Sequence, residues 1–271
     1  MPTVITLQDT IGWTENDGQP FTRFYWNTLM PAEMRKAATV ITISQHSQRD
    51  ILVRWPDLAP KLSVITRGIG DEYLNPHLQP AVPAVHQGLQ EKQYLVFLGG
   101  PAPRKRFDWG PQVPRHPGDA QLHLVACGFA QASHAKVMRQ ARPDLVQHVH
   151  MAPFLSNLEL LALYRGADVV LYPTLYEGFG FPAIEAQAAG VPAIFSPIGS
   201  LAELVGPLAF TPVVDELNSW VQAAARARAL GQGAQSWRRR RGRARSDFLG
   251  HRVVGSIWRY TGRQRNELHC D

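Results

Sequence analysis

The chain has few of the features that mark secreted, disulfide-bonded or membrane-spanning proteins. It contains only two cysteines, Cys127 and Cys270, among 271 residues, which is too few for a disulfide framework or a cysteine-based metal site. No run of about 18 uninterrupted apolar residues is present, so we expect no transmembrane helix. The first residues, MPTVITLQDT, lack the basic start and long apolar run of a signal peptide. We therefore expect a protein of the reducing cytoplasm.

Acidic residues are scarcer than basic ones, but the imbalance is local. Lys and Arg number 28 and Asp and Glu 22, which leaves a net charge of +6. One short run supplies six positive charges and thus the whole excess: Arg238, Arg239, Arg240, Arg241, Arg243 and Arg245. Such a run is a solvated helix face or a peripheral contact with anionic lipid at the inner face of the membrane. No aromatic-interleaved basic motif is present, so we expect no nucleic-acid partner.

Apolar segments alternate with helical patterns along the chain, which predicts an α/β fold with parallel sheets. Residues 1–78 carry three candidate strands (4–7, 39–43 and 62–66), a helix over 21–38 that breaks near Pro31, and a helix that Ser44 caps. A proline-rich stretch at 79–91 is the predicted linker. Residues 92–235 carry six candidate strands with intervening helices, typical of a doubly wound, Rossmann-like domain. Residues 236–271 are expected to form a helical tail.

One βαβ unit, read as PTLYEGFGFPAIEAQAAGVP over residues 173–192, concentrates the candidate functional residues. It follows a continuous apolar segment, as expected of a strand buried on both faces. Pro182 suits the first position of a helix and Gly190 suits the residue just past its end. The first N–H groups of that helix, from Gly180 to Ile184, form a predicted anion site.

Two glutamates flank this helix start. Glu185, in the first turn, is placed to accept hydrogen bonds from hydroxyl groups such as those of a ribose, while a diphosphate occupies the N–H groups. Glu177 is placed to face developing positive charge. A single glutamate here would indicate only an acid favoured by the helix dipole.

The segment EGFGFPAIEAQAAGVP resembles the E-x7-E signature of retaining glycosyltransferases of the GT-B fold, family 4 type. Glu177 and Glu185 stand at the two glutamate positions, and both glycines, the proline and the closing GVP match. The resemblance extends over nearly the whole chain. It implies a GT-B-like fold of two Rossmann-like domains, the N-terminal one incomplete, and a tail that packs back toward the N-terminal domain. A role in cell-envelope polysaccharide biosynthesis is also implied.

The resemblance implies roles for several residues. Glu185 would bind the nucleotide ribose, and Arg104 and Lys105 of YLVFLGGPAPRKR would hold the donor diphosphate together with Gly180, Phe181 and Pro182. The catalytic candidates are Glu177, Gln8 and Asp9. Cationic side chains can stabilise a diphosphate leaving group without a metal ion. No two aspartates are separated by one residue, so the metal-binding DxD motif of the other glycosyltransferase architecture is absent. We expect neither metal nor cofactor.

Four features depart from the family pattern. Gln8 stands where the family has a histidine; it can bind a hydroxyl but cannot become charged. Arg67 stands where an asparagine is usual. The glycines and prolines between 107 and 119 argue against the helix that the family has there. The N-terminal domain has fewer strands than is usual in the family.

The predicted activity is transfer of a sugar, with retention, from a nucleotide-diphosphate donor to a glycan, lipid or small-molecule acceptor. One alternative is a degenerate, non-catalytic homologue or a half-domain that needs a partner chain. Another is an interaction protein that acts through the arginine run.

Overall fold

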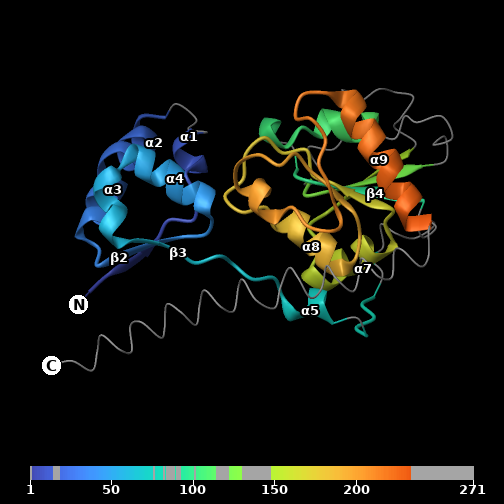
Figure 1. The fold of residues 1–271 in the computed structure, drawn as a ribbon, viewed down its shortest axis with the longest axis horizontal. Coiled ribbons are helices and arrows are strands. Elements are labelled where there is room, and N and C mark those ends of the chain that lie inside the picture. Colours follow the sequence, from blue (N-terminus) through green and yellow to red (C-terminus); the bar gives the residue numbers. More distant parts are fainter. Residues whose placement is uncertain are drawn as a thin grey trace. The chain divides into compact units, whose positions relative to one another are not determined.

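A computed structural model describes most of the chain, and its described residues form two units (Figure 1). Of the described residues, the first unit combines those up to 68 with the loop 176–180, and the second contains those in 69–175 and 181–232. The structure describes residues 2–14, 19–75, 77–81, 83, 89, 93–100, 102–113, 122–129 and 148–232.

The first unit is built on a parallel three-stranded sheet in the order β1-β2-β3. The strands are β1 (Val4–Thr6), β2 (Thr39–Thr42) and β3 (Leu62–Val64), with Ile5 opposite Val40 and Ile41 opposite Ser63. All three strands were predicted, each ending one or two residues earlier than the apolar run that indicated it.

Short helices cover this sheet: α1 (Ile11–Thr14), α2 (Pro20–Phe24), α3 (Met30–Lys36), α4 (Gln45–Arg54), the π-helix η1 (Tyr25–Leu29) and the 3₁₀-helix η2 (Pro56–Lys61). The Ser44 hydroxyl accepts a hydrogen bond from the Ser47 N–H at 3.0 Å, so the predicted cap of α4 is confirmed. A break near Pro31 was predicted, and the irregularity found there is the π-helix η1, which ends two residues before Pro31. Pro31 itself lies in the first turn of α3, where a missing N–H costs little.

The second unit is built on a parallel six-stranded sheet in the order β6-β5-β4-β7-β8-β9. Its strands are β4 (Tyr94–Leu98), β5 (His123–Cys127), β6 (Val149–Ala152), β7 (Val169–Leu171), β8 (Ala193–Ile194) and β9 (Ala209–Phe210). Numbered within the sheet, this order is 3-2-1-4-5-6, that of dinucleotide-binding folds. The order reverses between β4 and β7, where Val96 lies opposite Val170. Ligands of such sheets bind where the chain leaves the carboxyl ends of these two strands.

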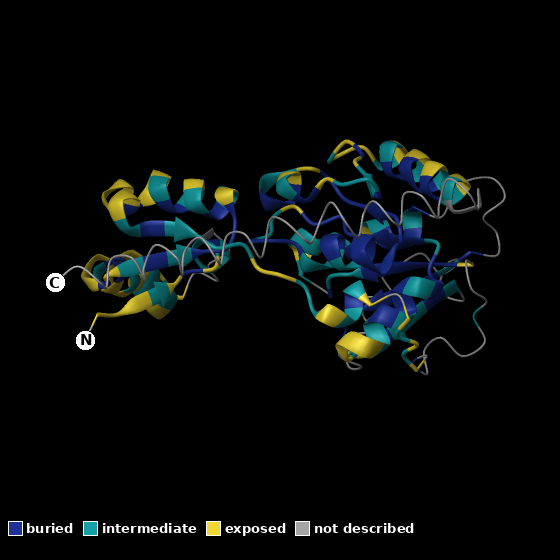
Figure 2. Ribbon diagram, turned by 60° about the horizontal axis from the view of Figure 1, so that its bottom comes forward, coloured by how far each residue is buried: buried dark blue, intermediate teal, exposed yellow. Residues whose placement is uncertain are grey.

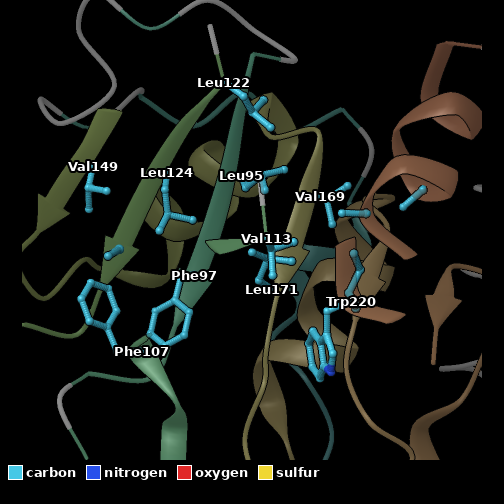
Figure 3. Packing of buried hydrophobic residues seen from close by; sticks show 14 of the residues in the cluster. Leu95, Phe97, Phe107, Val113, Leu122, Leu124, Val149, Val169, Leu171 and Trp220 are labelled. Carbon is cyan, nitrogen blue, oxygen red and sulfur yellow. The ribbon is translucent and has the colours of Figure 1, made fainter. Parts of the chain in front are cut away.

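Helices pack on both faces of this sheet. The helices are α5 (Asp71–Leu74), α7 (Asn157–Gly166), α8 (Phe181–Ala189) and α9 (Leu217–Gln232), with 3₁₀-helices η4 (Pro103–Lys105), η5 (Phe107–Gln112) and η7 (Gly199–Leu204). Alternate strand residues such as Leu95, Phe97 and Leu171 pack in one cluster with Trp220 of α9 (Figure 3). Tyr94, on the opposite face of β4, donates its hydroxyl to the Leu163 carbonyl of α7 at 2.7 Å. The inner strands β4, β5, β7 and β8 are accordingly buried on both sides, whereas the edge strands β6 and β9 are partly exposed (Figure 2).

The glycines and prolines between 107 and 119 argued against the helix that is usual in the family. The described part of this stretch forms the six-residue 3₁₀-helix η5, which contains Gly110 and Pro111, and residues 114–119 lie outside the described residues. Gly110 packs closely there: an added Cβ would lie 3.2 Å from the side chains of Phe97 and Leu124, which would have to move slightly to accept it. One of the helices predicted between the strands, over residues 131–142, lies outside the described residues. The predicted domain boundaries at 78, 91 and 235 remain a prediction.

Among the described residues, no helix combines the length and the apolar character needed to cross a bilayer.

Candidate functional site

The start of α8 lies at the carboxyl end of β7, as the sequence predicted. Gly180 has a φ of 103°, a backbone conformation that residues with a side chain rarely adopt, and the helix begins at the next residue, Phe181. Pro182 is in its first turn. Gly190, with a φ of 81°, follows its last residue, so the predicted helix end is confirmed. The helix thus presents its positive dipole end at the edge of the sheet where ligands bind.

The point between β4 and β7 where the strand order reverses is called the switch point below. A cationic turn follows β4, on the other side of this point from α8. Arg104 and Lys105 lie in η4, and both are half-buried. The Arg104 carbonyl accepts a hydrogen bond from the Leu175 N–H at 2.9 Å. The Lys105 ammonium donates to the Tyr172 hydroxyl at 3.2 Å and lies 5.0 Å from that ring's centroid. These contacts fix η4 against the residues that follow β7, so the two predicted diphosphate ligands lie at the switch point.

Glu185 of α8 is a buried carboxyl group of the second unit with a displaced pKa. Its Oε2 atom accepts a hydrogen bond from the Tyr164 hydroxyl of α7 at 3.3 Å. Burial raises the pKa of Glu185 to about 7, the charge of Glu72 adds to this increase, and the Tyr164 hydrogen bond opposes it. A displaced pKa beside a helix start and a cationic turn is typical of a functional carboxyl group.

Two residues near Glu185 were not found by sequence reasoning. Tyr73 of α5 is only 1% exposed, and its ring lies 6.3 Å from that of Tyr164, centroid to centroid. Glu72, beside it, accepts a hydrogen bond from the Asn157 side chain at 3.0 Å. The available signal was the sequence DEYL after Gly70, which does not indicate which residues Glu72 and Tyr73 lie beside.

The first unit contains the other predicted site residues, Gln8, Asp9, Glu177 and Gly180. Gln8 is exposed, and its carbonyl accepts a hydrogen bond from the Thr42 hydroxyl at 3.0 Å. Asp9 follows β1, and its Oδ1 atom accepts from the Ile11 N–H at 2.9 Å. A methyl group at Gly178 would overlap the Asp9 carboxylate. The structure therefore brings Asp9 against the residue that follows Glu177.

The loop carrying Glu177 is held by hydroxyl groups that the sequence did not single out. The Tyr176 hydroxyl donates to Asp50 Oδ2 at 2.5 Å and lies 2.8 Å from the Thr10 hydroxyl. The Ser47 hydroxyl donates to the Gly178 carbonyl at 3.3 Å. The adjacency of Tyr176 to Glu177 was the available signal. Its partners could not be found from sequence, because they are more than a hundred residues away.

Three histidines, His123, His148 and His150, gather toward the amino ends of β5 and β6, away from this site. His150 Nε2 and His123 Nδ1 are 2.9 Å apart. Burial, reinforced by the neighbouring histidines, lowers the pKa of both. Across the described part of the chain, no group of His, Cys, Asp or Glu is arranged to bind a metal ion. The arginine run and the predicted tail lie outside the described residues.

The sequence profile of the family described as "Glycosyl transferases group 1" matches residues 84–243, which is more than half of the chain. The chain belongs to this family. The matched range includes η4, Glu177, the start of α8 and Glu185. The predicted family membership and the predicted GT-B-like α/β fold with a small N-terminal sheet are confirmed.

The chain is similar in sequence to longer glycosyltransferases. The chain is 29% identical over 176 residues to an MMP alpha-(1->4)-mannosyltransferase of Mycolicibacterium hassiacum, which covers 64% of this chain and 40% of that protein. It is 25% identical over 207 residues to the O-antigen chain mannosyltransferase RfbU of Salmonella typhimurium, with 74% and 54% covered. The chain thus spans about half the length of these relatives.

Among solved structures, Anabaena HepE in complex with UDP and glucose has the same fold. It superposes with a TM-score of 0.70 at 19% identity, covering 97% of this chain and 71% of that one.

Proposed function

We propose that this protein is a retaining glycosyltransferase that transfers a sugar from a nucleotide-diphosphate donor to a glycan or lipid acceptor. The observation that carries the proposal is the convergence of three groups at one switch point. The cationic turn η4, the positive end of α8 and the Glu185 carboxyl all lie where the chain leaves β4 and β7. This combination suits a diphosphate joined to a ribose.

Each residue of this site has a distinct role in the proposal. Arg104, Lys105 and the N–H groups around Phe181 and Pro182 bind the diphosphate and stabilise its charge as the glycosidic bond breaks. Gly180, with its positive φ, lets the backbone turn into that helix start. Glu185 accepts hydrogen bonds from the ribose hydroxyls. This distribution requires no metal ion, because cationic side chains and a helix dipole supply the positive charge.

The residues proposed to act in catalysis belong to the first unit and are Glu177, Asp9 and Gln8. Glu177 stabilises positive charge on the sugar, and Asp9 and Gln8 bind hydroxyl groups. The leaving phosphate takes the proton of the acceptor hydroxyl, which then attacks from the face that the phosphate vacates, so the anomeric configuration is kept. A UDP-sugar is a suitable first donor, because the superposed HepE structure contains UDP and glucose, and mannose is a suitable sugar, because relatives are mannosyltransferases.

Calorimetry with UDP, GDP and ADP tests the donor site. We expect one nucleotide to bind, and Glu185→Ala to weaken it by about 1–3 kcal/mol, roughly 5- to 150-fold, the cost of losing a hydrogen-bonded charged group. Glu33→Ala, which alters an exposed glutamate of α3, is the matched control. If none of the three nucleotides binds the folded protein, the proposal is wrong.

A second candidate is a homologue that binds a nucleotide sugar without transferring it. Gln8 favours it, because a glutamine cannot gain the charge that a histidine can. Incubation of the donor with candidate acceptors distinguishes the two. Formation of a glycoside whose anomeric NMR coupling matches the donor's supports the transferase, whereas binding without turnover supports the second candidate.

A further inference from the structure

Three basic residues, Arg104, Lys105 and Arg106, follow one another after β4, and the third has an unusual backbone. Arg106 has a φ of 51° and a ψ of 50°, which is the left-handed region. Among the residues that the structure describes, it is the only one other than glycine with a positive φ. A side chain in this region is strained and persists only where the surrounding structure holds it. The contacts of Arg106 should therefore show what holds it there.

The Arg106 side chain is engaged by the loop that precedes α9. Its guanidinium donates to the Val214 carbonyl at 2.7 Å and to the Asp215 carboxylate, which is an ion pair. It also lies over the Trp109 ring, 4.4 Å from the ring centroid. Because both terminal nitrogens bind this loop, the guanidinium is committed to the protein. Arg106 thus differs in role from the two basic residues before it, which are the proposed diphosphate ligands.

The loop that receives Arg106 is itself attached to the core of the second unit. Trp220 of α9 donates its ring N–H to the Val213 carbonyl at 3.1 Å, and the Ser219 hydroxyl accepts from the Val213 N–H at 3.0 Å. Trp220 is only 1% exposed, packs in the core cluster and contacts the Trp109 ring edge-on. The guanidinium is therefore bound to a fixed part of the unit.

The backbone of Arg106 closes the turn that carries the two other cations. Its N–H donates to the Pro103 carbonyl at 3.0 Å, across Arg104 and Lys105. Its carbonyl accepts from the Trp109 N–H at 3.0 Å, which begins η5. A displacement of Arg106 would therefore carry both cations with it.

We propose that Arg106 is a positioning residue, whose anchored guanidinium and left-handed backbone direct Arg104 and Lys105 at the diphosphate. This inference rests on the proposed function, because it assumes that those two cations bind the diphosphate. The contacts with Val214 and Asp215 offset the strain of the left-handed backbone. The strain is retained because it sets the direction of the turn.

Asp215→Ala separates positioning from charge. Removing this carboxylate takes a negative charge away from a cationic turn, so charge alone would tighten the binding of a nucleoside diphosphate. Positioning predicts the opposite, a loss of about two- to fivefold, because the guanidinium loses one of its two partners. Calorimetry with whichever of UDP, GDP and ADP binds best measures the change. Asp108→Ala, which removes an exposed carboxylate of η5 two residues from Arg106, is the matched control and should bind as tightly as the wild type or more tightly.

Arg106→Gly tests the residue itself. Glycine adopts the same φ without strain, so the turn can still form while the guanidinium is lost. We expect binding to weaken about tenfold, and Arg106→Lys, which keeps one donor group, to recover part of the loss. In a Lys105→Gln background the factor should fall to about threefold or less, because one of the two positioned cations is already gone. Thermal unfolding by circular dichroism confirms that each variant is folded.

The possible outcomes separate this inference from the proposed function. If a nucleotide binds and Asp215→Ala binds it as tightly as Asp108→Ala does, Arg106 acts through its charge alone and the positioning role is overturned. If Arg106→Gly costs the same factor with and without Lys105→Gln, its role is structural and the inference also fails. In both cases the proposed function stands. If the wild type binds no nucleotide, the proposed function and this inference are both overturned.

Discussion

Single side chains position the candidate site through hydroxyl groups. In the first unit, the Tyr176 hydroxyl lies between Asp50 and Thr10, next to Glu177. Burial raises the pKa of Tyr176 and the Asp50 hydrogen bond raises it further, so the phenol remains a donor at every physiological pH. The backbone on which Glu177 is carried is therefore fixed by a neutral donor and a carboxylate acceptor.

Removing that hydroxyl should loosen the loop. We expect Tyr176→Phe to lower the free energy of unfolding of the first unit by about 1.5–3 kcal/mol, the range for a hydrogen bond to a charged group. Urea titration monitored by near-UV circular dichroism measures this change. Tyr25→Phe, which removes a tyrosine hydroxyl from η1 of the same unit, is the control. Coincident midpoints for Tyr176→Phe and the wild type would show that the bond contributes nothing.

The stability of a single helix depends on how its ends are capped as well as on how its apolar face packs. The sequence SNLE at 156–159 has the spacing of a capping box, and α7 begins with one. The Ser156 hydroxyl accepts from the Glu159 N–H at 3.4 Å, and Glu159 Oε2 accepts from the Ser156 N–H at 2.8 Å. Because α7 carries Tyr164, this cap also sets where the hydroxyl donor to Glu185 lies.

Removing this cap should lower the stability of the protein by a defined amount that depends on pH. Ser156→Ala should cost about 1 kcal/mol of stability at neutral pH, and Ser156→Thr much less. Hydrogen bonds from Ser156 lower the pKa of Glu159, so the contribution of that carboxylate is present above its unfolded pKa and is lost as the pH falls through the lowered value. The difference between the wild type and Ser156→Ala in thermal unfolding should therefore shrink in acid. A difference that grows in acid would contradict this assignment.

At the scale of the whole molecule, the segment that carries the net positive charge lies outside the described residues. Six arginines between 238 and 245 equal the net charge of +6. We propose that this run contacts anionic lipid, since each arginine near such a surface contributes about 1 kcal/mol.

The full chain with these six arginines changed to glutamine should lose most of its binding to phosphatidylglycerol vesicles in co-sedimentation at low salt. It should keep the nucleotide affinity of the wild type. If the wild-type chain itself does not sediment with the vesicles, the run is a solvated surface.

The sequence predicted what depends on local pattern. Buried strands such as Val169–Leu171 appear as apolar runs, and Ser44, Pro182 and Gly190 mark helix ends through their own backbone chemistry. Partners distant in sequence could not be predicted. No periodicity shows that Tyr176 meets Asp50 or that Tyr73 lies near Tyr164, because those contacts follow from how elements pack. The π-helix before Pro31 was missed for a related reason, since a proline marks a boundary without indicating which kind of turn precedes it.

The position of β4 has a consequence for how the chain is made. It is the first strand of its sheet to leave the ribosome, yet it ends up between β5 and β7. The β7 side of this strand can pair only after Val170, the partner of Val96, has been synthesised, which is 170 − 96 = 74 residues later. At roughly 5–20 residues per second, this edge stays open for about 4–15 s of translation. The apolar strand at the middle of the finished sheet is thus the one that the nascent chain must protect longest.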